Sequence, residues 1–386
     1  MAIQISAASG TEAVLKRELS SLGYTPDGAR YGRIRVEGDM RDVARCNVFL
    51  RTAGRVRIIL ADFSAQSFDE LFDAVYALNW RDVLPRDAAV TVTAKSVKSR
   101  LYSLSDIQRI TKKAIAAKMC AAYGCARMSE TGAVYGIEAS ADEDVFTLAL
   151  DTSGDGLHKR GYRIYLGDAP IRETLAAAIL QLSVWRKDRP FADPFCGSGT
   201  FPIEAAMIAA NVAPGLTRRF SFEEFPNAPT VSDSVREEAR AMIDRSYKPR
   251  IQGFDINPSA IKLAVKHAER AGVREMIHFQ TADMRIFSSR YSHGVICTNP
   301  PYGERLMTPK EVETLYRDFG AVFSRLDEWS AYVITSFRGF EKHFGRRADR
   351  TRKLYNSEIE CNLFAFLGAP PRRRNEKQYN TEENGK

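Results

Sequence analysis

Two patterns of apolar and polar positions alternate along the first 150 residues. Apolar and polar residues alternate with a period of two over 31–36, which predicts a strand, whereas apolar residues three and four positions apart over 11–22 predict a helix. Helical stretches follow the N-cap candidates Thr11, Asp39, Ser67 and Ser105. The predicted strands cover 3–7, 31–36, 56–63, 89–94, 134–139 and 145–150. This order predicts two small α+β units in succession.

From Arg172 onward, helices of ten or more residues alternate with short apolar strands. We predict helices over 172–185, 200–210, 258–271 and 309–325, and strands over 191–193, 251–255, 277–280, 294–298, 330–335 and within 358–367. Such alternation is typical of right-handed crossovers, so the second half is predicted to be an α/β fold with a doubly wound, mostly parallel sheet. The Gly-rich, basic segment 151–163 reads as a linker or hinge between the halves, and the polar tail from Pro370 is expected to be disordered.

Length and composition narrow the class of protein. The 386 residues suffice for two or three domains, and 56 basic against 48 acidic residues indicate a mild preference for a polyanionic partner. The N-terminus shows no basic region followed by an apolar core, and no run of about 18 apolar residues occurs, so we expect a cytoplasmic protein with no membrane partner. Six scattered cysteines without a CxxC pair, with only five histidines, predict no structural metal.

A glycine-containing turn follows the predicted strand 191–193, in the stretch DPFCGSGT at 193–200. Glycines at a strand-to-helix turn let the backbone approach a ligand closely, and ligands bind at the carboxyl ends of a parallel sheet. No Gly-Lys-Ser/Thr follows, which excludes a P-loop, and the missing third glycine argues against a dinucleotide fingerprint. The turn therefore predicts a small-molecule site of another kind.

Two acidic residues follow the next strands. Asp255 ends the strand 251–255 just before a helix that begins at Pro258, and a carboxylate there can accept hydrogen bonds from both ribose hydroxyls. It lies 58 positions after Gly197, so residues of about 211–250 are expected to form an insertion. Asp283 follows the strand 277–280, where its carboxylate could accept from the amino group of an adenine. Helix capping and a solvated loop remain alternative roles for these two carboxylates.

The stretch Asn299-Pro300-Pro301-Tyr302-Gly303 follows the strand 294–298. Two successive prolines stiffen the backbone, so that the Asn299 amide oxygen and the Pro300 carbonyl are held as fixed acceptors for an exocyclic amino group. Tyr302 offers a flat face on which a base can stack. The stretch therefore predicts a site for an amine-bearing base.

These motifs resemble those of a known family. Residues 193–200 resemble motif I of class I S-adenosylmethionine-dependent methyltransferases, and 299–302 resemble the (N/D)PP(Y/F) motif of enzymes that methylate exocyclic or amide nitrogens. With Leu50–Arg55, 151–163 and Ala169–Ala178, the whole chain is similar to a bacterial family with a ferredoxin-like piece, a THUMP RNA-binding domain and a methyltransferase domain. The best-known activity of that family is N2-methylation of guanine in 23S ribosomal RNA. Longer members carry a second methyltransferase domain, so one activity is expected here.

The resemblance implies a role for each motif residue and a set of domains. The cofactor, S-adenosylmethionine, would be bound by Asp193, Pro194, Cys196, Gly197, Gly199, Thr200, Asp255, Ile256, Asp283, Met284 and Asn299, and the catalytic residues that hold the target base would be Asn299, Pro300, Pro301 and Tyr302. The implied domains are a ferredoxin-like subdomain (1–52), a THUMP domain (53–152), a linker (153–171), the methyltransferase domain (172–369) and a basic, polar tail (370–386).

The expected partner is RNA, as 23S ribosomal RNA or a large-subunit precursor, with no prediction for the oligomeric state. Its phosphates are expected to contact Lys95, Lys98, Arg100, Arg109, Lys112, Lys159 and Arg160. Cys196 and Cys297 near the site are expected to pack rather than to act as nucleophiles. The alternatives are a tRNA guanine-N2 methyltransferase, a DNA adenine-N6 or cytosine-N4 methyltransferase, a protein-glutamine methyltransferase and a non-catalytic ribosome assembly factor.

Overall fold

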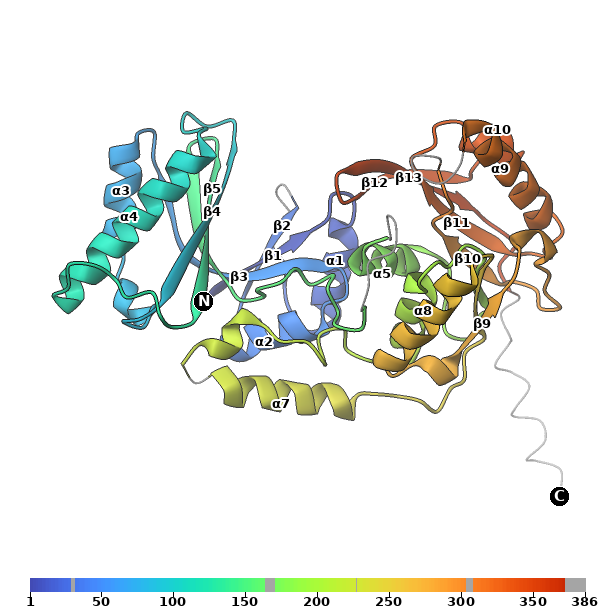
Figure 1. Ribbon diagram of the computed structural model, residues 1–386, viewed down its shortest axis with the longest axis horizontal. Helices are drawn as coiled ribbons and strands as arrows, with labels where there is room; N and C mark the ends of the chain where they lie inside the picture. The colour runs from blue at the N-terminus through green and yellow to red at the C-terminus, as the bar shows by residue number, and fades with distance from the viewer. Residues whose placement is uncertain (29–31, 164–170, 227, 303–307, 372–386) are drawn as a thin grey trace, which may run out of the picture.

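The computed structural model describes residues 1–28, 32–163, 171–226, 228–302 and 308–371. The predictions for Tyr31, Gly303, residues 164–170 and the tail beyond 371 lie outside these ranges. Two sheets with their covering helices make an elongated molecule, with the N-terminal sheet and the C-terminal sheet in separate lobes (Figure 1).

The N-terminal half is built on one six-stranded sheet, to which both predicted units contribute strands. Its strands are β1 (Ala2–Ala7), β2 (Arg33–Glu37), β3 (Ala53–Ser64), β4 (Ala89–Val97), β5 (Val134–Asp142) and β6 (Val145–Asp151), in the order β2-β1-β3-β6-β5-β4. The two predicted units share this sheet, because the twelve-residue strand β3 pairs with β1 of the first unit and with β6 of the second. The predicted boundary at 52/53 therefore falls at the start of a strand that both parts share.

Four helices cover a single face of this sheet. They are α1 (Glu12–Ser21), α2 (Met40–Phe49), α3 (Phe68–Ala77) and α4 (Leu104–Tyr123). The register aligns one apolar row across all six strands, formed by Val36, Ile3, Ile58, Leu150, Ile137 and Val92, and this row packs in one core with the helices. Helix α4 begins after Ser103, not after Ser105 as predicted, because the Ser103 carbonyl oxygen already accepts a helical hydrogen bond from the Ile107 N–H (3.0 Å).

The C-terminal half is a seven-stranded sheet with the order β12-β13-β11-β10-β7-β8-β9. Its strands are β7 (Phe191–Asp193), β8 (Ile251–Asp255), β9 (Ile277–Thr281), β10 (Val295–Thr298), β11 (Ser330–Thr335), β12 (Arg350–Asn356) and β13 (Ile359–Phe366). Strands β7 to β11 are parallel, and β13 runs antiparallel to both of its neighbours. The edge strand β12 was not predicted, because its first four residues are exposed and polar.

Helices cover both faces of this sheet. One core contains residues of α5 (Glu173–Leu182), α6 (Thr200–Ala209) and α8 (Pro258–Arg270), and the other contains residues of α9 (Pro309–Phe323) and α10 (Phe340–Phe344). The predicted doubly wound α/β architecture is confirmed.

The segment that we predicted as a linker or hinge is packed between the halves. Thr152 and Ser153 are fully buried, and the Arg218 guanidinium donates to the carbonyl oxygens of Ser153 (3.2 Å), Asp155 (2.7 Å), Gly156 (2.8 Å) and Lys159 (3.0 Å). The backbone of this connecting segment is therefore held by hydrogen bonds from the second half.

The predicted insertion reaches back to the first half. Its helix α7 (Ala228–Ala241) packs on α2, where Arg41 and Arg45 both pair with Glu238 (2.7 and 3.2 Å). This insertion helps to fix the two halves against each other.

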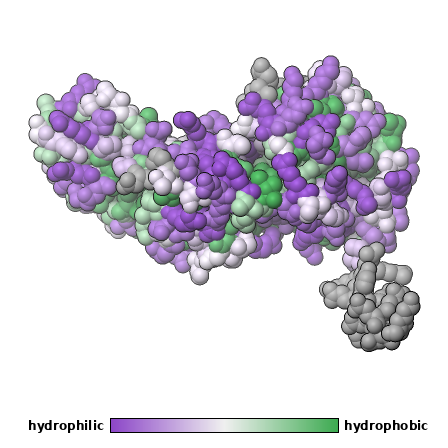
Figure 2. Space-filling view, turned by 90° about the horizontal axis from the view of Figure 1, so that it is seen from below, coloured by the Kyte–Doolittle hydropathy of each residue, from purple (hydrophilic) through white to green (hydrophobic). Residues whose placement is uncertain are grey.

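Hydrophilic residues dominate the face seen from below in Figure 2, and hydrophobic ones are scattered there.

Candidate functional site

The predicted site residues meet at one edge of the C-terminal sheet. Strands β10, β7, β8 and β9 are adjacent in that order and parallel, so their carboxyl ends lie along the same edge. Asp193 ends β7, Asp255 ends β8, Asp283 follows β9 and Asn299 follows β10. The structure therefore brings together the four stretches that the sequence singled out.

Asp193 is the buried carboxyl at the centre of this edge. Only 2% of the residue is exposed, and its Oδ1 accepts hydrogen bonds from the Thr298 hydroxyl (2.6 Å) and the Phe195 backbone N–H (3.1 Å). Burial raises the pKa of Asp193 from 3.8 to about 7, although these two hydrogen bonds act against the rise. The Thr298 contact ties the end of β7 to the strand that carries Asn299.

The glycine turn leaves space beside its backbone. Gly197 has φ +52°, and, its two chain neighbours aside, no atom of the described residues lies within 4 Å of the position that a Cβ would take. Its N–H donates to Asp255 Oδ2 (2.9 Å), while Asp255 Oδ1 accepts from the Asn257 N–H (2.9 Å). At Gly199, φ is +87° and a Cβ would lie 2.9 Å from the Ala264 side chain, so a left-handed backbone and close packing both require glycine. Asp255 thus holds the turn and ends the next strand.

Apolar side chains are exposed beside the two acidic strand ends. Ile256, directly after Asp255, is 68% exposed, and Ile286, just beyond Asp283, is 70% exposed. Asp283 accepts from the Arg285 backbone N–H and guanidinium (2.9 and 2.8 Å). We did not predict Ile286, although an isolated apolar residue in a polar loop was a visible signal. Met284 is buried with the core, so its side chain serves packing at this site.

The Asn-Pro-Pro stretch is held from below by an aromatic side chain. Tyr316 on α9 donates a hydrogen bond from its hydroxyl to the Pro301 carbonyl oxygen (2.8 Å), and its oxygen also lies 3.0 Å from the Thr335 hydroxyl at the end of β11. Asn299 and Tyr302 are half-buried, and Pro300 is buried. Tyr316 lies 15 positions from Pro301, and no local motif marked it.

Two further residues that the sequence analysis missed support the glycine turn. The Arg163 guanidinium donates to the Thr200 hydroxyl (2.6 Å) at the start of α6 and pairs with Glu173 (3.2 Å). The buried His267 of α8 has its Nδ1 3.2 Å from the Ser198 carbonyl oxygen, and burial lowers the pKa of its imidazole. These contacts position the turn between Asp193 and α6.

Both cysteines near the site are buried, and their burial favours the thiol over the thiolate. Burial raises the pKa of the Cys196 thiol well above its ordinary value and raises that of Cys297 as well. A nucleophilic cysteine needs a thiolate, so these environments disfavour covalent catalysis through either sulfur.

The predicted RNA contacts lie on several elements, and most of them pair with a carboxylate. Lys95 lies on β4 and Lys98 and Arg100 follow that strand, Arg109 and Lys112 lie on α4, and Lys159 lies in the connecting segment. Five of these side chains each pair with a carboxylate: Lys95 with Glu138 (3.3 Å), Lys98 with Glu143 (3.9 Å), Arg109 with Asp106 (2.9 Å), Lys112 with Glu130 (2.8 Å) and Lys159 with Asp155 (2.8 Å).

Arg160 is not placed to contact RNA. It is 2% exposed, and its guanidinium pairs with the fully buried Glu204 of α6 (3.3 Å) and donates to the carbonyl oxygen of Leu157 (2.9 Å). A basic run in the sequence suggested a solvent-exposed cation here, but the structure uses Arg160 to join the connecting segment to the helix after the glycine turn.

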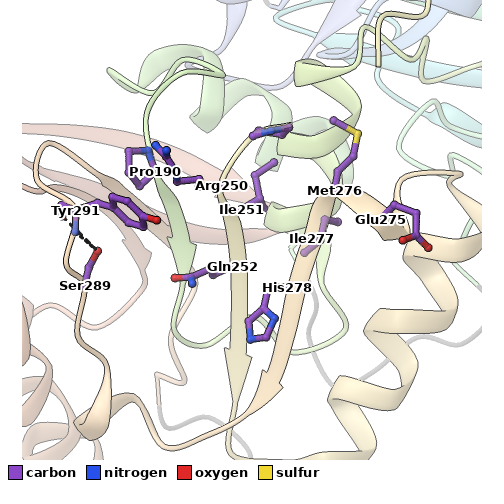
Figure 3. Close-up of a pocket in the computed structure, with 11 residues that line it drawn as sticks. Pro190, Arg250, Ile251, Gln252, Glu275, Met276, Ile277, His278, Ser289 and Tyr291 are labelled. Atoms are coloured by element: carbon purple, nitrogen blue, oxygen red, sulfur yellow. Dashed lines mark hydrogen bonds between the residues drawn. The ribbon is translucent and has the colours of Figure 1, made fainter. Parts of the chain in front are cut away.

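A separate cavity of about 390 Å³ lies at the opposite end of the same strands (Figure 3). It is lined by Pro190, Arg250 and Glu275, which come just before β7, β8 and β9 in the sequence. Gln252 and His278, which line it, are the second residues of β8 and β9, whereas Asp193 and Asp255 stand at the other ends of β7 and β8. In the described ranges, no group of three or more His, Cys, Asp or Glu residues is placed to hold a metal ion. No helix among the same residues is long and apolar enough to cross a membrane.

Comparisons with known proteins match most of the chain. Residues 160–365 match the methyltransferase domain described as RMKL-like, residues 2–57 match the RlmL ferredoxin-like domain, and residues 65–151 match the THUMP domain. YpsC of Bacillus subtilis, named as a candidate RNA methyltransferase, is 42% identical over 375 residues, which cover 95% of this chain and 96% of that protein.

Longer relatives and solved structures are also similar. The ribosomal RNA large subunit methyltransferase K/L of Allochromatium vinosum is 33% identical over 92% of this chain, which spans about half (50%) of that relative. The crystal structure of SMU.472, described as a candidate methyltransferase complexed with SAH, has a TM-score of 0.89 and 41% identity, covering 96% of this chain and 98% of that one. The crystal structure of a Listeria monocytogenes protein, described from prediction as an N6-adenine-specific DNA methylase, has a TM-score of 0.90 and 44% identity. The match covers 95% of this chain and 96% of that one.

Proposed function

The chain belongs to the RMKL-like methyltransferase family, and we propose on that basis that it transfers a methyl group from S-adenosylmethionine to the exocyclic N2 amine of a guanine in 23S ribosomal RNA. The observation that carries the proposal is the common edge formed by the ends of β10, β7, β8 and β9. The similarity to ribosomal RNA large subunit methyltransferase K/L supports large-subunit ribosomal RNA as the substrate. We keep the domain boundaries implied by the sequence as part of this proposal.

The residues of the edge fit the cofactor. The open space beside Gly197 admits a ligand against the backbone, and the buried Asp193 carboxyl suits the ammonium group of the methionine end. Asp255 would accept from the ribose hydroxyls, and the exposed Ile256 offers an apolar contact for the adenine, near Asp283. SMU.472 was crystallised with SAH, the form of the cofactor that has lost its methyl group. The remaining turn residues, Pro194, Cys196, Gly199 and Thr200, would line the same end.

The cofactor carries an activated methyl group on a sulfonium, so the protein mainly aligns the reacting atoms and excludes water. Asn299 and the Pro300 carbonyl oxygen would accept the two N–H bonds of guanine N2, drawing the nitrogen toward the methyl group and stabilising positive charge as it develops. Tyr302 would stack on the base, and the Pro301 carbonyl stays fixed by Tyr316. This arrangement requires no strong base.

The role of Asn299 has a direct test. Asn299→Ala should lower the rate of single-turnover methylation by roughly a hundredfold, as loss of one preorganised polar group typically does. Cofactor affinity, measured by calorimetry, should change by much less. Lost cofactor binding with near-normal single-turnover methylation in preloaded enzyme would show that Asn299 serves the cofactor and not the base.

The substrate is identified by exposing the purified chain and labelled S-adenosylmethionine to under-modified ribosomal RNA, transfer RNA and DNA. Modified nucleosides are then separated by mass spectrometry, and we expect N2-methylguanosine from 23S RNA alone. N2-methylguanosine from transfer RNA would keep the chemistry and change the substrate, whereas N6-methyladenine in DNA, as the name of the Listeria protein suggests for that protein, would overturn the proposal.

A further inference from the structure

The face of the N-terminal sheet that carries no helices is polar and concave. The neighbours of the apolar row point to this face, and the register aligns Arg35, Gln4, Arg57 and Asp151 across four strands. Arg33 on β2 donates to the Ser140 hydroxyl on β5 (2.5 Å), although three strands lie between them. In a flat sheet these strands would be about 19 Å apart. The sheet is therefore strongly curled, and its polar face lines the inside of the curve.

Three cations meet one carboxylate on this concave face. Glu138 pairs with Arg33 (3.1 Å), Arg57 (3.0 Å) and Lys95 (3.3 Å), and 4% of its side chain is exposed. Burial acts to raise the pKa of Glu138, but Arg57, Lys95 and Arg33 outweigh it and lower the value. The neighbouring carboxylates Asp62 and Asp151 pair with cations of their own, Arg35 and Arg55, so Asp151 offsets the charge of Arg57 only in part.

Two buried donors beside the cluster also lack an acceptor. Gln4 and Arg57 stand opposite each other in the β1–β3 pairing, and they are 1% and 6% exposed. Neither Gln4 Nε2 nor Arg57 Nε has a hydrogen-bond partner among the residues that the structure describes. Leaving a buried donor unsatisfied costs about 1–3 kcal/mol, so the site is incomplete in both charge and hydrogen bonding.

We propose that this concave face binds an oxyanion, namely a backbone phosphate of the RNA substrate, next to Lys95, Arg33, Arg57 and Gln4. A phosphate supplies both the negative charge and the acceptor oxygens that the cluster lacks. Lys95 and Arg33, with 59% and 23% of their side chains exposed, form the open side of the site, and Arg57 and Gln4 lie beneath them. The identity of the anion as RNA rests on the proposed function; the oxyanion site itself does not.

This site also separates two sets of basic residues. Helix α4, with Arg109 and Lys112, packs on the apolar face of the sheet, whereas Lys95 points to the concave face. An RNA segment that contacts Lys95 on the concave face therefore lies on the opposite side of the sheet from α4.

The test compares Lys95→Ala with Lys187→Ala in the full chain. Lys187 is a matched control because it also pairs with one carboxylate, Asp244 (3.2 Å), and is similarly exposed (47%), but lies in the other half. Affinity for a 23S RNA transcript is measured at several salt concentrations. Lys95→Ala should reduce the slope of log affinity against log salt by about 0.7 to 0.9, the value for one phosphate contact, while Lys187→Ala keeps the slope of the unaltered chain.

A second measurement uses inorganic phosphate and no RNA. Sodium phosphate should raise the thermal unfolding midpoint of the unaltered chain above that in sodium chloride of equal ionic strength, and Lys95→Ala should lose this rise. If phosphate acts this way but the RNA slope is unchanged, the site takes a free phosphate and the RNA assignment is overturned. If neither measurement responds to Lys95→Ala, the oxyanion site is overturned. A chain that methylates no RNA would refute the proposed function while leaving the phosphate result intact.

Discussion

Replacing the buried carboxyl at the centre of the site should make the protein more stable and bind its cofactor less well. The pKa of Asp193 is raised by burial from 3.8 to about 7, which means that the fold disfavours the carboxylate. Below about pH 4 this carboxyl is protonated in both the folded and the unfolded chain. As the pH rises from about 4 to 7, the unfolded chain loses the proton first, so the free energy of unfolding falls over this range. At about 1.4 kcal/mol for each unit of pKa, the full cost above pH 7 is about 4 kcal/mol.

Asp193→Asn removes this cost because an amide stays neutral at every pH. Its oxygen can still accept from the Thr298 hydroxyl and the Phe195 N–H. We expect the cofactor-free variant to be more stable than the unaltered chain by up to about 4 kcal/mol at pH 8, by roughly 2 kcal/mol at pH 5 and by little near pH 4. Urea unfolding followed by the fluorescence of Trp185 and Trp329, both in the C-terminal half, measures these differences.

The same variant should bind S-adenosylmethionine roughly tenfold to a hundredfold more weakly at pH 8, because a charged hydrogen bond worth about 1.5–3 kcal/mol is lost. Affinity of the unaltered chain should rise between pH 5.5 and 7 as Asp193 ionises, and that of Asp193→Asn should not. A variant that is less stable than the unaltered chain at pH 8, or a stability difference that does not change with pH, would refute the assignment of the raised pKa to burial.

Two contacts outside the motifs yield further predictions. Tyr316→Phe removes the donor to the Pro301 carbonyl and should lower kcat about fivefold to tenfold with unchanged cofactor affinity, as steady-state kinetics and calorimetry would show. Tyr332→Phe, which alters a hydroxyl that accepts from a backbone N–H outside this stretch, is the control, and equal losses would contradict the positioning role. Arg218→Ala should lower the free energy of unfolding by at least about 2 kcal/mol and expose the connecting segment to limited proteolysis, while Arg219→Ala at the exposed neighbour should change neither.

The candidate site was predictable because its signals are local. The glycine turn, the prolines after Asn299 and the carboxylates at strand ends each occupy a few consecutive residues, and a parallel sheet places all such ends at one edge. The alternation of helices and strands indicated that sheet without any knowledge of contacts. The position of the insertion also followed from the spacing between Gly197 and Asp255.

Other features required the tertiary structure because they depend on residues far apart in the chain. Arg160 belongs to a basic run, and only its packing against Glu204, 44 positions away, removes it from the RNA surface. Strand β12 pairs on one side only, so its exposed polar residues carry no apolar pattern.

The chain therefore determined by itself the residue types at the strand ends, the periods of its strands and helices, and thus the kind of site. The tertiary structure alone decided which charges are buried and which face each cation occupies. Burial of Asp193 depends on the strands packed around it, and the gathering of Arg33, Arg57 and Lys95 around Glu138 depends on the curl of a sheet whose strands come from distant segments. The physical reason is that a pKa and an ion pair are properties of the surroundings in space, which periodicity along the chain does not specify.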